Sequence, residues 1–125
     1  MKGTTTLELP RIEGSAGLAR LIVTAHGSSL GSEQLKNANV MVSELVSNAF
    51  QHGEGQICLT VESGPDGVWA QVSDEGCPPA IATPDPRPER RGWGLQFVDQ
   101  LADSWGVGTD EARVWFRVGV TAPVP

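Results

Sequence analysis

Two polar side chains stand out in an apolar stretch of the sequence, because their types and spacing suit chemistry on a bound ligand. Glu44 and Asn48 lie four residues apart within residues 43–53, so on a helix they are one turn apart along a single stripe. Gln51 and His52 continue this stripe. A carboxylate among apolar neighbours needs a cation, a hydrogen-bond donor or a ligand. This stretch is therefore the first candidate for a functional site.

A third polar residue, Asp74, ends a run that alternates as a strand does. Val68, Ala70 and Val72 share one face of that run, and the two-residue period of a strand sends Asp74 to the same side. A carboxylate on the buried side at a strand end is a candidate for recognising the hydrogen-bond donors of a ligand.

A glycine-containing run, Arg91-Gly92-Trp93-Gly94-Leu95, directly precedes a pattern of helical spacing. Glycines before a helix allow phosphate groups to approach the backbone amides that the first helical turn leaves unpaired. The run therefore predicts an anion-binding helix start.

The elements that must position these residues follow from the apolar patterns. Apolar residues recur at three- and four-residue steps over residues 35–50, with no glycine or proline inside, so Glu44 and Asn48 are placed on a long helix. An earlier helix is predicted over residues 15–25, capped by Ser15. Its expected apolar face consists of Leu18, Leu21, Ile22 and Ala25.

Strands are predicted on both sides of the long helix. Residues 4–9 end at Pro10, which favours a strand at a sheet edge. Two hairpins are expected over residues 57–73 and 104–120, whereas the prolines of residues 75–91 indicate a loop. The predicted fold class is α+β, a two-layer sandwich of a mixed, mostly antiparallel sheet with helices on one face.

Length and composition limit the possible functions. The 125 residues predict a single domain, 1–125, and the net charge of -6 argues against non-specific binding to nucleic acid or to an anionic membrane. Cys58 and Cys77 lack the spacing of metal ligands, so reduced thiols in the cytoplasm are expected, with a disulfide as the open alternative. Without a signal peptide or a membrane-length apolar run, the protein is expected to be soluble.

In order and spacing, the polar clusters resemble the motifs of the GHKL ATP-binding fold, whose members include gyrase, histidine kinases and mismatch-repair proteins. The stretches 43–53 and 94–106 further resemble stand-alone anti-sigma-factor serine/threonine kinases of bacteria. The motifs that carry the resemblance are Glu44-x-x-x-Asn48, Asp74-Glu75-Gly76 and Gly92-x-Gly94.

This resemblance implies ATP and Mg²⁺ as cofactors and assigns a role to each matched position. Asn48 matches the residue whose side-chain oxygen binds Mg²⁺, and Glu44 matches the general base that activates a hydroxyl or a water. Asp74 matches the carboxylate that accepts a hydrogen bond from the adenine amino group. The remaining implied ATP-binding residues are Gly76, Arg91, Gly92, Gly94, Leu95 and His52. For His52, an interaction with the helix dipole is the alternative.

The resemblance also implies a function and partners. The protein would bind a sigma factor and phosphorylate an antagonist protein, without direct nucleic-acid or membrane contact, and could form a homodimer. The alternative is a non-catalytic interaction module of the same fold with weak or no ATP turnover. This alternative is open because Cys77-Pro78-Pro79 stands where the family commonly has a second glycine, and because the expected ATP lid is short.

Overall fold

The computed structural model describes residues 3–52, 56–74, 96–107 and 113–119. Within them, five strands and three helices follow one another along the chain. They are β1 (Gly3–Leu9), α1 (Ser15–His26), α2 (Ser32–His52), β2 (Ile57–Gly64), β3 (Gly67–Ser73), α3 (Gln96–Leu101), β4 (Ser104–Val107) and β5 (Arg113–Gly119).

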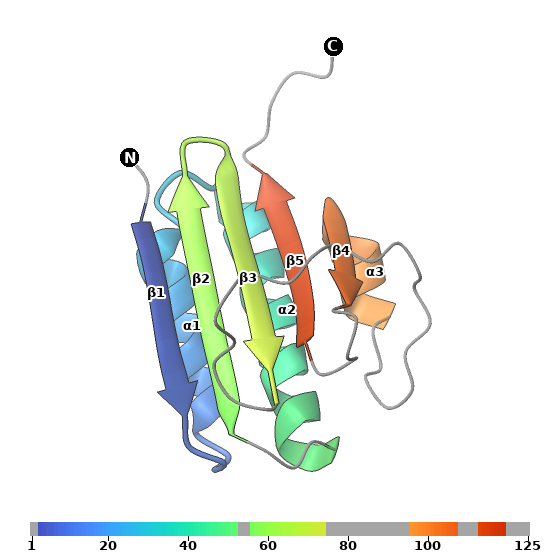
Figure 1. The fold of residues 1–125 in the computed structure, drawn as a ribbon. Coiled ribbons are helices and arrows are strands. Elements are labelled where there is room, and N and C mark those ends of the chain that lie inside the picture. Colours follow the sequence, from blue (N-terminus) through green and yellow to red (C-terminus); the bar gives the residue numbers. More distant parts are fainter. Residues whose placement is uncertain (1–2, 53–55, 75–95, 108–112, 120–125) are drawn as a thin grey trace.

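The strands form one sheet in the order β1-β2-β3-β5-β4, and every described pairing is antiparallel. α1 and α2 lie against one face of this sheet (Figure 1). α3 packs beside α2 and β4. The predicted α+β two-layer fold is therefore confirmed, including the place of β1 at the sheet edge.

Both predicted hairpins are present among the described strands. β2 and β3 are antiparallel partners, and Gly64 pairs with Gly67 at their turn. Gly67 has a φ of 142°, and a Cβ atom there would lie 2.3 Å from the carbonyl oxygen of Val118, so glycine is required. β4 pairs with β5, and the pairing of β3 with β5 joins the two hairpins into one sheet.

The alternation along the strands sorts apolar from polar side chains as the sequence predicts. On the helix side, Val72 pairs with Val114 and Ala70 pairs with Phe116, and all four are fully buried. Trp69 and Trp115 point to the opposite face, because each lies one position away from these residues. The helices thus cover only the apolar face of the sheet, as far as the structure describes it.

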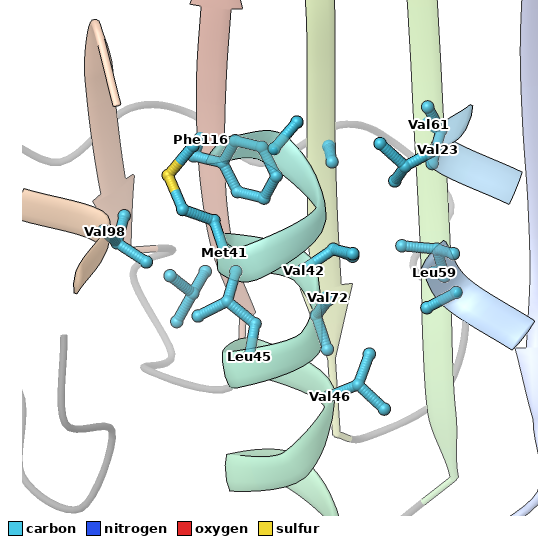
Figure 2. Packing of buried hydrophobic residues seen from close by; sticks show 14 of the residues in the cluster. Val23, Met41, Val42, Leu45, Val46, Leu59, Val61, Val72, Val98 and Phe116 are labelled. Atoms are coloured by element: carbon cyan, nitrogen blue, oxygen red, sulfur yellow. The ribbon is translucent and has the colours of Figure 1, made fainter. Parts of the chain in front are cut away.

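α2 supplies most of the helical half of the core. Figure 2 shows Met41 beside Phe116 of β5, and Val42 and Val46 facing Val72 of β3. Val40, one of the apolar residues within 35–50, is 38 % exposed, although the periodic pattern of that stretch predicts an apolar surface. The residues of α2 that are at most 1 % exposed are Ala38, Met41, Val42, Leu45, Val46 and Ala49.

The predictions for α1 need two corrections. Ser15 does not cap the helix, because Gly14 occupies the N-cap position and the Ser15 hydroxyl donates to the Pro10 carbonyl. The buried stripe of α1 consists of Ser15, Ala19 and Val23, whereas Leu21 is 69 % exposed. Small side chains at four-residue steps let α1 approach α2 and the sheet closely. The predicted face instead contained the largest apolar residues of the helix and was therefore wrong in part.

Cys58 corrects the expectation of reduced thiols. It is buried in β2 and is disulfide-bonded, so the alternative left open by the sequence applies to it, while Cys77 lies outside the described residues. Disulfides are uncommon in reducing compartments, so this bond does not favour a cytosolic setting. No helix in the described part of the chain is long and apolar enough to cross a membrane.

His26 joins the end of α1 to the first two strands. Its Nε2 atom lies 2.8 Å from the Thr5 hydroxyl of β1, and its Nδ1 atom lies 2.7 Å from the Ser63 hydroxyl of β2. An imidazole can satisfy both hydroxyl groups at once, because each hydroxyl either donates or accepts. His26 therefore has a structural role, which no motif in the sequence indicated.

We expect His26→Leu to lower the free energy of unfolding by about 1–3 kcal/mol, because it leaves two partly buried hydroxyls without their partner. Urea denaturation measures the change. The exposed Ser28→Ala variant serves as the control. A double-mutant cycle with Ser63→Ala tests the pair itself, and a coupling energy of zero would contradict the assigned role.

Candidate functional site

The start of α2 sets the rotational position of the residues that follow. The Leu35 amide donates to the Gly31 carbonyl at 2.9 Å, and the Gly31 amide donates to Gln34 Oε1 at 3.0 Å. The first of these is the first backbone hydrogen bond of the helix, and the second satisfies an amide that a helix start would otherwise leave unpaired. Glu33 in the first turn also interacts favourably with the helix dipole. From this start, the helix continues to His52.

Glu44 and Asn48 occupy adjacent turns of α2, as their spacing predicts. Asn48 is only 8 % exposed, whereas Glu44 is half-buried. The apolar neighbours Leu45 and Ala49 are fully buried on the core side. The buried amide therefore lies at the margin of the core, and the carboxylate lies where both protein and solvent can reach it.

Arg11 holds the C-terminal turn of α2. Its Nη1 atom donates to the Ala49 carbonyl at 2.8 Å and to the Phe50 carbonyl at 3.0 Å. The last carbonyls of a helix lack partners within the helix and carry its negative dipole end, so a guanidinium satisfies them in both respects. Sequence reasoning missed Arg11, because one arginine between a strand and a helix gives no specific signal.

Asp74 directly follows β3 and is half-buried. Figure 1 shows that β3 ends beside the C-terminal turns of α2, and Val42 and Val46 pack toward Val72 in Figure 2. The packing of α2 against β3 thus brings the strand end that precedes Asp74 to the end of the helix that carries Asn48.

α3 lies on the other flank of α2. In Figure 2, Val98 of α3 points toward the side chains of Met41 and Leu45. The Trp105 indole donates to Asp99 Oδ1 at 3.0 Å, which ties α3 to β4. The helix that follows the glycine run is therefore anchored to the same core as the long helix.

The other predicted site residues are not all described. His52 is the last residue of α2. The remaining members of the predicted set, Gly76, Arg91, Gly92, Gly94 and Leu95, lie outside the described residues.

Among the described residues, few side chains at this place could ligate a divalent metal. The described residues contain no cluster of three or more histidine, cysteine, aspartate or glutamate side chains that could hold a metal ion. Mg²⁺ is commonly bound through one or two protein oxygens together with substrate phosphates and waters. The amide oxygen of Asn48 fits that mode of binding and would not suffice alone.

The α+β fold of the described residues agrees with the result of the family comparison. Residues 10–118 match the model of the histidine kinase-like ATPase domain. The chain belongs to this family, and its α+β sheet with helices on one face is a GHKL-type ATPase fold, which implies that it binds ATP. No curated protein matches the chain.

We expect Arg11→Met, which keeps the aliphatic stem, to loosen the last turn of α2. Loss of two hydrogen bonds from a charged donor should lower stability by about 1–3 kcal/mol. Amide hydrogen exchange should accelerate in the final turn of α2 and stay unchanged near Ala38. Equal protection of the final turn in both proteins would contradict the capping role, and Lys36→Met at an exposed position is the control.

Proposed function

We propose that this protein is an ATP-dependent serine/threonine protein kinase of the anti-sigma-factor type. The observation that carries the proposal is the family match over residues 10–118 together with Glu44 and Asn48 on adjacent turns of one helix. The proposed partners are a sigma factor, which the protein binds, and an antagonist protein, which it phosphorylates. The resemblance of residues 43–53 and 94–106 to such kinases supports this choice within the family.

The proposed chemistry assigns one role to each described polar residue. The Glu44 carboxylate takes the proton of the acceptor hydroxyl. The hydroxyl oxygen bonds to the γ-phosphorus of ATP, while the bond from this phosphorus to the β–γ bridging oxygen breaks and ADP leaves. Asn48 would hold Mg²⁺ through its amide oxygen, and the bound ion would supply positive charge beside the phosphates. Asp74 accepts a hydrogen bond from the adenine amino group.

The half-buried state of Glu44 suits a general base, which must touch an acceptor arriving from solvent. The buried state of Asn48 suits a ligand whose position must not change during transfer. The remaining proposed contacts to ATP involve Gly76 at the base and the following phosphate-binding residues. These residues are Arg91, Gly92, Gly94, Leu95 and His52.

We expect Asn48→Ala to weaken binding of a non-hydrolysable ATP analogue by about tenfold or more in Mg²⁺, the loss expected for a metal-ligand contact. In EDTA, the variant and the parent protein should bind with similar affinity. Calorimetry measures both. Gln51→Ala, at an exposed position one turn away, is the control. An equal loss with and without Mg²⁺ would argue against a metal ligand, and no binding at millimolar nucleotide would remove the kinase proposal.

We expect Glu44→Gln to slow phosphoryl transfer by about 10²–10⁴-fold, the usual contribution of a general base, with nucleotide affinity nearly unchanged. Labelled ATP provides the readout, both with candidate antagonist proteins and as slow hydrolysis by water. Glu33→Gln in the first turn of α2 is the matched control. If the parent protein binds ATP but transfers nothing to any candidate, the non-catalytic interaction module is the better description.

A further inference from the structure

An open groove of about 570 Å³ runs along the surface of α2, which supplies all of its lining residues except Arg20 of α1. Its walls are mostly apolar, and Leu35 and Val40 contribute to them. Val40 is 38 % exposed, so its apolar side chain is accessible to solvent. Arg20 contributes from α1, where its guanidinium donates to the Ser43 hydroxyl of α2. The surface thus consists of α2 and of the Arg20 side chain, which a hydrogen bond links to Ser43 of α2.

The groove follows α2 for several turns. Its lining on that helix extends from Ser32 to Glu44, which corresponds to about 18 Å at about 1.5 Å per residue. An elongated apolar trough of this length matches an amphipathic helix that places apolar residues at three- and four-residue steps. A compact small molecule would leave much of it uncovered.

Charge selects the kind of helix. The chain carries a net charge of -6, yet Arg20 and Lys36 both line the groove and are exposed. Among the described cations, Arg11 is bound to the end of α2, and Arg113 and Arg117 belong to the face of β5 turned away from the helices. Among the described residues of α1 and α2, the exposed positive charges therefore lie at this groove. They outnumber its one carboxylate, Glu44, and favour an acidic partner.

Glu44 connects the groove to the candidate site. Its side chain lines the groove, whereas Asn48, one turn further along α2, does not. A general base must come within hydrogen-bond reach of the hydroxyl that it deprotonates. A segment lying along the groove would therefore end beside Glu44.

We propose that the α1–α2 groove is the docking site of the phosphoryl acceptor, which binds through an acidic amphipathic helix. The identity of the occupant as the acceptor rests on the proposed kinase function. The docking itself does not, since it needs neither ATP nor transfer.

Two labelled synthetic peptides of about 14 residues test the docking in the absence of nucleotide, this length being sufficient for the groove at about 1.5 Å per residue. Both carry leucine at three- and four-residue steps, and they differ only in having glutamate or lysine on the polar face. Fluorescence anisotropy against the full chain should show binding of the glutamate peptide alone. Amide NMR shifts should change at Asn39 and Val40 in the groove. Equal binding of both peptides, or shifts elsewhere, would overturn the proposal.

Variants then assign the contact. Lys36→Gln should lower the affinity for the glutamate peptide by about fivefold, the effect expected for the loss of one exposed ion pair. Gln100→Glu changes the net charge equally at an exposed position of α3 and should have no effect. Val40→Asp should weaken binding by at least about tenfold through loss of apolar contact and added repulsion. Melting curves of the variants verify folding.

The outcomes separate this proposal from the proposed function. Selective peptide binding with no ATP binding supports the groove and removes the kinase role. ATP binding and phosphoryl transfer that Lys36→Gln and Val40→Asp leave unchanged, together with no peptide selectivity, overturn the groove and keep the kinase. Loss of a homodimer in Val40→Asp, seen by sedimentation without any peptide binding, would assign the groove to a second copy of the chain and overturn the proposal.

Discussion

The burial of α2 against the sheet is the constraint on which the rest of the structure depends. Its apolar side chains contact β3, β5 and α3, and Met41 lies between Phe116 and Val98 (Figure 2). Rotation of the helix by one residue would expose part of this surface and bury Glu44 without a partner, at a cost of several kcal/mol. The core packing therefore fixes the direction of Glu44 and Asn48.

Polar contacts at the ends of the helices complete that constraint. Arg11 binds the carbonyls at the end of α2, and His26 connects the end of α1 to Thr5 and Ser63. Neither contact is central in the core, and each joins elements that are far apart in the sequence. Such contacts fix the helix ends, where backbone groups lack internal partners and where the candidate site begins.

The periodicity of apolar residues predicted the helices and strands that bury one regular face. The long helix, both hairpins and the placement of Trp69 and Trp115 on the sheet face away from the helices follow from the periodic patterns. The pattern did not predict that Trp115 is only 8 % exposed on that face. The exposed Leu21 shows the limit, because α1 packs against α2 and the sheet through its small residues and no single-sequence pattern reveals that. For the site, spacing predicted Glu44 and Asn48 on one helix, but long-range partners such as Arg11 could not be inferred. Strand order was likewise beyond local patterns.

The order of the strands in the sheet affects how the chain folds during synthesis. β3 lies in the middle of the sheet, yet its second neighbour is β5, the last strand in the described part of the chain. During synthesis, β1, β2, β3 and both long helices leave the ribosome before residues 113–119 exist. Until then, one edge of β3 offers unpaired backbone groups to any neighbouring strand. Truncation before residue 113 therefore removes a pairing partner of the central strand β3, and it leaves an unpaired strand edge that favours aggregation.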